Sequence, residues 1–337
     1  LNSEGVLMNS LYRFTIATIL ALSLTFLIGC SSDDDDNPTG PSTTNSFTEA
    51  AEIGDAYLTA GTKNITAADL YADIQAGTNL FMIDFRSADH FANRGHIEGA
   101  VNWTIGSLPD NVGQIPSGAK VICICYSGQT ASHATAYLNM MDYNAYNLKW
   151  GMCGWTTDET VNPPTSAWYG LVPGGQATEP TAHSLTTEYE FPSLDCEAVE
   201  VCVHDNCNAF FDSGLKYISA ADLYLNLNDG DTSNDPFLLS YWNETSYNGG
   251  HIPGSFRFEP GSLGPDELLE YVPTDKQIVV WCYTGQTSAQ VSTYLNMLGY
   301  NAYSLQFGMN AINPALCGTS IFHAPTTDYP VVMGTAA

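Results

Sequence analysis

An internal repeat constrains the fold of this chain more than any other feature of its sequence. The segment Ile122–Thr130 recurs as Val279–Thr287, at an offset of 157 residues, and the same register relates Tyr137–Leu148 to Tyr294–Leu305. A repeat that holds its register over about thirty residues indicates two copies of one domain and not a solenoid of short units. At 337 residues the chain has room for two such domains, each able to bury a core.

Each copy places a cysteine where a strand is predicted to end and a helix to begin. In the second copy, Cys282 follows the apolar run 277–280, and Val291, Leu295 and Leu298 then share one face of a helix. The glycine in the connecting loop allows backbone N–H groups to turn toward the sulfur. Because these groups and the helix N-terminus favour negative charge, we expect a thiolate nucleophile with a depressed pKa, within roughly 3.5–7.5 or slightly below 8.5 if exposed.

Three motifs in order resemble the rhodanese (sulfurtransferase) superfamily. They are Asp84-Phe85-Arg86, the Gly-His-Ile segments at 95–100 and 250–255, and the Cys-x-x-Gly-x-Thr loops at 125–130 and 282–287. The resemblance extends from about Ile65 to Met309. It implies an α/β fold with two rhodanese-like domains, each a mainly parallel central sheet flanked by helices.

The resemblance also implies that Cys125 and Cys282 are catalytic. Each would take a sulfane sulfur from a small donor, such as thiosulfate or a persulfide, and pass it as a persulfide to a thiol or cyanide-like acceptor. No metal and no organic cofactor is expected. The implied substrate-binding loops are two runs of five residues, Tyr126, Ser127, Gly128, Gln129 and Thr130, and Tyr283, Thr284, Gly285, Gln286 and Thr287.

The sequence departs from the family pattern in two places. Both loops are uncharged, whereas well-known thiosulfate-using members carry basic residues there, so thiosulfate is doubtful as the donor. Ser240-Tyr241-Trp242 replaces Asp-x-Arg in the second copy.

Two other functions compete with sulfur transfer. A phosphatase would need the motif Cys-x5-Arg, but Ala131 and Ser288 occupy the arginine position, so a phosphatase function is rejected. A non-catalytic binding module for an anion or a redox partner is the alternative.

Other residues near the motifs have either a structural or a functional interpretation. We expect Arg86 to form a structural ion pair, and His96 and His251 to fix turns through side-chain hydrogen bonds. His133 is a candidate acid or base, although Gln290 replaces it in the second copy. Lys149 is a weak candidate for contact with an anion.

The first fifty residues predict export and a lipid anchor. The apolar run 14–28 ends in Leu27-Ile28-Gly29-Cys30, which resembles a bacterial lipobox with Cys30 lipidated. The prediction is a lipoprotein in the cell envelope, on the outer membrane, that contacts the membrane through this anchor only. Nine Lys and Arg against 36 Asp and Glu argue against nucleic acid. The oligomeric state cannot be predicted.

The predicted organisation is a signal peptide (1–29), a tether (30–50), a first domain (51–170), a linker with a cysteine cluster (171–208), and a second domain with a packed tail (209–337). An exported chain with six further cysteines suggests disulfides, with fifteen possible pairings. Cys123 is expected to be a buried apolar residue, and a pairing within 196–207 is favoured. The six are Cys123, Cys153, Cys196, Cys202, Cys207 and Cys317.

Overall fold

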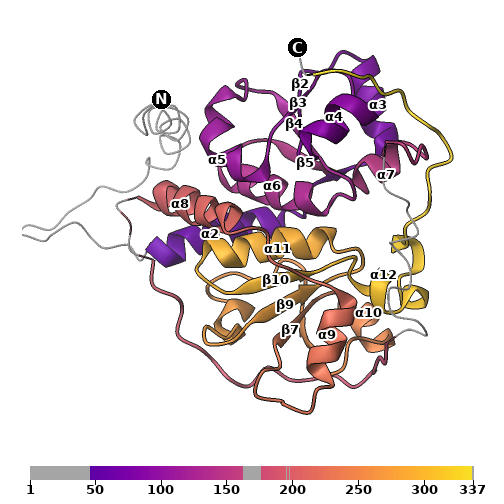
Figure 1. Ribbon diagram of the computed structural model, residues 1–337. Helices are drawn as coiled ribbons and strands as arrows, with labels where there is room; N and C mark the ends of the chain where they lie inside the picture. The colour runs from indigo at the N-terminus through magenta and orange to yellow at the C-terminus, as the bar shows by residue number, and fades with distance from the viewer. Residues whose placement is uncertain (1–45, 162–175, 195, 197, 336–337) are drawn as a thin grey trace, which may run out of the picture.

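The computed structural model describes residues 46–161, 176–194, 196 and 198–335 and contains two five-stranded sheets (Figure 1). Within each sheet, every neighbouring pair of strands is parallel. The first sheet contains, in spatial order, β1 (Asn64–Ile65), β5 (Ala145–Leu148), β4 (Lys120–Ile124), β2 (Leu80–Asp84) and β3 (Ala100–Asn102). The second contains β6 (Tyr217–Ile218), β10 (Ala302–Leu305), β9 (Ile278–Trp281), β7 (Phe237–Tyr241) and β8 (Phe256–Phe258). The predicted α/β fold with two parallel sheets is confirmed.

The helices follow the same repeat. Thr66 and Ser219 cap equivalent helices. Each side chain accepts a hydrogen bond from the backbone N–H three residues later, as its position before an Ala-Ala-Asp-Leu run predicts. The first domain contains α3 (Ala67–Gln75), α4 (Ala88–Arg94), α5 (Leu108–Asn111), α6 (Gln129–Met140) and α7 (Gly151–Trp155). The second contains α9 (Ala220–Leu227), α10 (Glu244–Gly249), α11 (Gln286–Met297) and α12 (Met309–Ile312). Short 3-10 helices lie at Ile105–Ser107, Val112–Gln114, Leu268–Tyr271, Pro314–Leu316 and Gly318–Ser320.

A helical layer joins the two domains. Figure 1 shows α6 and α11 between the sheets, together with α2 (Ser46–Thr59) and α8 (Val199–Asp212). One hydrophobic cluster includes buried residues of both domains and of α2 and α8, among them Phe47, Tyr137, Phe211 and Tyr294. The Tyr294 hydroxyl donates to the carbonyl of Leu263 at 2.7 Å and lies 3.2 Å from that of Ala51. Because this interface is a continuous apolar core, the domains should move as one unit.

Two helices cross the predicted domain boundaries. Helix α2 begins at Ser46, within the predicted tether, and buries Phe47 and Ala50 against the core. Helix α8 runs across the predicted boundary between linker and second domain at 208. Both helices bury apolar side chains between the domains, which the local sequence pattern does not reveal.

The C-terminal tail divides between the two domains. Leu316, Cys317 and Ile321 pack in the core of the second domain, as predicted, but the last described residues lie against the first domain (Figure 1). The indole of Trp155 donates to the carbonyl of Pro330 at 3.0 Å, and Val332 forms an antiparallel bridge with His96. Thr157 also donates to the carboxylate of Asp328. The chain therefore crosses back and ties the two domains together a second time.

The predicted signal peptide, Cys30 and most of the tether lie outside the described residues, and envelope localisation stays a prediction. Within the described ranges, no helix is both long and apolar enough to span a bilayer. A disulfide joins Cys196 and Cys202, with 5.8 Å between their Cα atoms. Cys207, expected in the same cluster, is instead a free buried thiol; Cys123 and Cys317 are also free and buried, and Cys153 is buried.

Candidate functional site

Both motif cysteines lie at the carboxyl end of a central strand. Cys125 directly follows β4 and Cys282 directly follows β9, and each of these strands is the middle one of its sheet. In open parallel sheets, ligands bind at this edge. Both cysteines are free, and each residue is 3% exposed.

Backbone amides point at both sulfurs. The N–H groups of Gly128 and Ala131 donate to Cys125 Sγ at 3.1 and 3.4 Å. In the second domain, the N–H of Ser288 donates to Cys282 Sγ at 3.3 Å, and the Ser288 hydroxyl lies 3.6 Å from the same sulfur. These donors come from the loop and from the first turn of α6 or α11, so each sulfur sits at a helix N-terminus that favours negative charge.

The predicted depressed pKa is wrong for Cys125. Burial raises the pKa of the Cys125 thiol, and the nearby charge of Asp84 raises it further. The backbone N–H groups of Ala131, Ser127 and Gly128 oppose this rise but do not overcome it. The sequence shows the amide donors, whereas the loss of hydration depends on packing that closes around the sulfur.

The remaining loop residues divide into a buried and a half-buried set. Thr284 accepts a hydrogen bond from the N–H of Gln286 at 3.2 Å, which is a turn-forming role. The Thr130 hydroxyl lies 3.5 Å from that of Tyr217 in the second domain. Gly128, Gln129, Thr284, Gly285 and Gln286 are buried, and Tyr126, Ser127, Thr130, Tyr283 and Thr287 are half-buried.

In each domain, a glycine that comes after the last strand packs closely against the cysteine loop. Gly151 and Gly308 have φ of 55° and 53°, and a Cβ on either would lie 2.3 or 2.2 Å from the carbonyl oxygen of Cys125 or Cys282. This close approach lets Met152 and Met309 donate their N–H groups to those carbonyls, both at 2.8 Å. Only glycine fits there, which explains why both copies of the repeat contain it.

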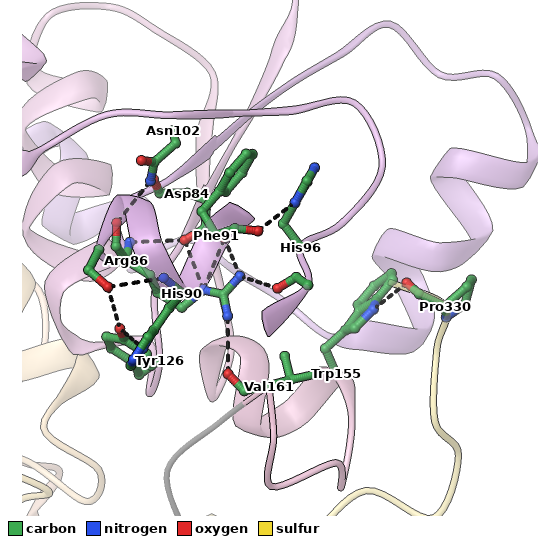
Figure 2. A network of polar contacts seen from close by, with 12 residues as sticks. Asp84, Arg86, His90, Phe91, His96, Asn102, Tyr126, Trp155, Val161 and Pro330 are labelled. Carbon is green, nitrogen blue, oxygen red and sulfur yellow. Dashed lines mark hydrogen bonds and ion pairs between the residues drawn. The ribbon is translucent and has the colours of Figure 1, made fainter. Parts of the chain in front are cut away.

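Arg86 forms a structural clamp in the first domain, as expected. Figure 2 shows its guanidinium between Asp84 and the carbonyl of Val161. The guanidinium also donates to the carbonyl of Gly95 at 2.8 Å. The ion pair with Asp84 is 2.7 Å long, and both side chains are fully buried. Since its donors are engaged within the protein, Arg86 orders the loops around the site and is not a free anion receptor.

Aromatic residues replace this clamp in the second domain. Trp242, which follows β7 as Arg86 follows β2, packs against Trp281 and Tyr283, with ring centroids 4.8 and 4.4 Å away. The hydroxyl of Tyr283 hydrogen bonds with that of Ser246. In the first domain, Tyr126 instead bonds with His90 (Figure 2). The two sites therefore have equivalent backbones but different surroundings.

The histidines of the Gly-His-Ile motifs fix turns. His96 Nδ1 lies 2.9 Å from the carbonyl of Phe91, and its ring stacks on that residue. His251 Nδ1 lies 2.8 Å from the carbonyl of Tyr247 and stacks in the same way. This expectation is confirmed.

His133 is buried at the domain interface, whereas contact of Lys149 with an anion stays a prediction. His133 Nδ1 lies 2.7 Å from the hydroxyl of Thr293 across the domain interface. Burial lowers its pKa to about 3, so the ring is neutral at physiological pH and belongs to the interface. The ammonium of Lys149 lies 5.7 Å from the ring centroid of Trp150.

The side chains of two loop glutamines reach across to the other domain, an arrangement that the motifs do not predict. Gln129 accepts a hydrogen bond from the N–H of Phe307 at 3.0 Å. In return, Gln286 accepts from the N–H of Trp150 at 3.1 Å and from the side chain of Asn147 at 2.9 Å. The identical offset of these glutamines and of their backbone partners was the available signal. Each active loop thus positions a residue of the other domain.

Replacing Gln286 by alanine is expected to destabilise the protein by about 1–3 kcal/mol, because the buried donors that it satisfies lose their acceptor. Gln129→Ala should cost less, since Gln129 accepts a single bond across the interface. Urea unfolding measures both, with Gln114→Ala, an exposed glutamine, as the control. Losses equal to that of the control would show that the crossed bonds do not stabilise the interface.

These features define a tandem α/β protein with a cysteine loop at the carboxyl edge of each sheet. The family model for the rhodanese-like domain matches residues 66–158 and 219–315, more than half of the chain. The chain therefore belongs to the rhodanese-like family, with two copies of the domain. The resemblance expected from the motifs is confirmed.

Curated relatives match about a quarter of the chain, the length of one domain, at low identity. The putative sulfurtransferase YtwF of Bacillus subtilis is 29% identical over 93 residues, which is 28% of this chain and 89% of that protein. The thiosulfate sulfurtransferase GlpE of Shewanella oneidensis is 31% identical over 75 residues, covering 22% of this chain and 73% of that protein. A crystal structure of a thiosulfate sulfurtransferase from Pseudomonas aeruginosa is 16% identical, with a TM-score of 0.30, covering 83% of this chain and 49% of that one.

Proposed function

We propose that the protein is a sulfurtransferase that carries a sulfane sulfur on Cys125, Cys282 or both. The observation that carries the proposal is the set of backbone N–H groups directed at each sulfur, 3.1 and 3.4 Å from Cys125 and 3.3 Å from Cys282. Such donors stabilise a thiolate, and would equally stabilise the terminal sulfur of a persulfide anion. Family membership and the named relatives support the same class of reaction.

The reaction divides into two displacements. The cysteine thiolate attacks the outer sulfur of a donor R–S–S⁻, the S–S bond breaks, and R–S⁻ leaves with the electron pair. The enzyme then holds Cys–S–S⁻. An acceptor thiolate attacks the outer sulfur, forms the acceptor persulfide and releases the cysteine as thiolate; cyanide as acceptor gives thiocyanate. The oxidation states balance without a cofactor, and two easier steps replace one difficult one.

A persulfide is a better candidate donor than thiosulfate. Thiosulfate is a dianion, and neither loop contains a lysine or arginine to pair with its sulfonate group. Arg86, whose guanidinium carbon lies 5.8 Å from the ring centroid of Tyr126 in the first loop, is engaged with the buried carboxylate of Asp84. A persulfide carries a single charge, which the amide donors can accommodate.

Incubation with glutathione persulfide is expected to add one sulfur atom at Cys125 or Cys282, and cyanide should remove it. Intact mass before and after cyanide, followed by peptide mapping, measures both outcomes. Cys207 and Cys317 serve as internal controls, because burial raises the pKa of both thiols. An adduct confined to these control cysteines, or one that resists cyanide, would refute the proposal.

The second candidate is a binding module without catalysis. The observation that favours it is the burial of both cysteines together with the raised pKa of Cys125, which lowers the thiolate fraction. In that case the persulfide donor would leave neither mass adduct nor thiocyanate, and the two candidates are separated by the same experiment.

A further inference from the structure

The connection between the domains brings a carboxylate and a histidine to the edge of the second sheet. Glu179 forms an antiparallel bridge with His251, with both backbone N–H···O distances at 2.9 Å, and His183 bridges Phe256 at the start of β8. These pairings fix the backbone at both Glu179 and His183. The side chains of Glu179, His183 and His251 then converge, and their three ligand atoms lie within 4.8 Å of one another.

The orientation of His251 leaves a nitrogen without a partner. Its side chain is fully buried, and Nδ1 lies 2.8 Å from the carbonyl of Tyr247. Because a carbonyl oxygen can only accept, Nδ1 carries the hydrogen and Nε2 presents a lone pair. Among the residues that the structure describes, Nε2 has no hydrogen-bond partner, and it lies 3.8 Å from Glu179 Oε1, which is too long for a hydrogen bond.

This arrangement matches the way proteins prepare a histidine to bind a metal. A metal-binding imidazole commonly donates its second ring N–H to a backbone carbonyl, which fixes the tautomer and the ring plane. The ring of His251 is held further by stacking on Tyr247, at 3.6 Å between centroids. A buried nitrogen lone pair without a donor is otherwise costly, and a cation would satisfy it.

The distances between the ligand atoms fit a small divalent ion. Glu179 Oε1 lies 2.8 Å from His183 Nε2 and 3.8 Å from His251 Nε2. Ligands of a tetrahedral zinc ion at usual bond lengths are about 3.3 Å apart, which falls between these two values. The N–H of Gly254 donates to Glu179 Oε1 at 2.8 Å and holds the carboxylate in place.

We propose that Glu179, His183 and His251 form a binding site for a divalent transition metal ion of the Zn²⁺ type. Two imidazoles and one carboxylate suit such an ion, and the half-exposed side of the cluster leaves a position for water. A bound ion would attach the connection between the domains to the outer edge of the second sheet. The site is separate from the cysteine loops in sequence and uses none of the residues proposed for sulfur transfer.

The first domain provides a comparison within the same chain. His96 occupies the equivalent turn and makes the equivalent carbonyl bond, but its bridge partner is Val332 of the tail. Valine offers no ligand atom in the place where the second domain has Glu179. The sequence motif alone therefore does not make a site; the added carboxylate and His183 do.

Titration of the metal-free full chain with Zn²⁺, against a chromophoric chelator, is expected to show one tight equivalent. Glu179→Gln and His183→Ala should each weaken it at least tenfold, since loss of outer-shell partners alone costs about 10–100-fold. His204→Ala is the matched control and should leave the affinity unchanged, because His204 pairs with Asp205 at 3.1 Å and belongs to no group of three possible ligands in the described part of the chain. Co²⁺ in place of Zn²⁺ should give visible bands of a nitrogen and oxygen site without thiolate charge transfer.

Three results would overturn the proposal. The first is a Zn²⁺ affinity unaffected by Glu179→Gln and His183→Ala. The second is a cobalt spectrum with thiolate charge transfer, which would place the ion on cysteines. The third is several weak equivalents of surface binding in place of one tight equivalent. Sulfur transfer by the Glu179→Gln variant should equal that of the wild type. The metal site and the proposed activity can therefore fail independently.

Discussion

Serine at both Cys125 and Cys282 is expected to abolish sulfur transfer, whereas each single serine variant should keep the activity of the other domain. Serine is close to cysteine in shape but cannot form a persulfide, so the loss tests the nucleophile and leaves the packing nearly unchanged. Thiocyanate release from a persulfide donor and cyanide measures the rates, and thermal unfolding confirms that all variants fold. Residual turnover in the double variant would move the chemistry to another cysteine.

The Cys282→Ser variant isolates Cys125 and makes its pKa measurable. The reactive species is the thiolate, and burial and the Asp84 charge raise the pKa of Cys125, so the thiolate fraction at neutral pH is small. Below the pKa, that fraction grows with every unit of pH. The rate of persulfide formation on Cys125 should therefore rise about tenfold from pH 7 to pH 8. A rate that is flat over this interval would mean that the thiol is already ionised and that the amide donors outweigh burial.

The parts of the fold that the sequence predicts are those set by local chemistry. The apolar runs before Cys125 and Cys282 are strands, the residues Thr66 and Ser219 cap helices, and the Gly-His-Ile segments are turns fixed by their histidines. Each of these depends on neighbours within a few residues, so spacing and residue type are sufficient.

The parts that the sequence does not predict depend on distant contacts. The tail reaches the first domain because Trp155 and His96 offer partners to it, and nothing near Val332 encodes that destination. The cysteine cluster predicts a pairing within 196–207, but the sequence does not decide which two of its three cysteines pair; Cys196 and Cys202 do, and Cys207 is a buried free thiol.

The candidate site shows the same division. Its cysteines and loop residues follow from the repeat, but the direction of the Cys125 pKa depends on burial by the surrounding protein. The crossed glutamines and the approach of Glu179 to His251 require the relative placement of segments far apart in sequence. The repeat offset relates the two glutamines to each other, but it does not say how one domain is placed against the other.

Replacing Arg86 by methionine is expected to lower the free energy of unfolding by about 3–5 kcal/mol, because it leaves the buried carboxylate of Asp84 without its counter-charge. The carbonyl of Val161 (Figure 2) and that of Gly95 lose their donor in the same step. Urea or thermal unfolding measures the loss. The exposed pair of Arg257 and Glu259 gives the matched control, and Arg257→Met should cost less than about 1 kcal/mol.

The second domain indicates how the same position can be stable without charge. There Ser240 replaces the aspartate and Trp242 replaces the arginine, and the indole packs on Trp281 and Tyr283. Because removing both charges leaves no unpaired ion, Asp84→Ser combined with Arg86→Met should recover a large part of the stability lost by Arg86→Met alone. If the double variant is as unstable as the sum of the two single variants, the loss comes from the hydrogen bonds to Gly95 and Val161 and not from the unpaired carboxylate.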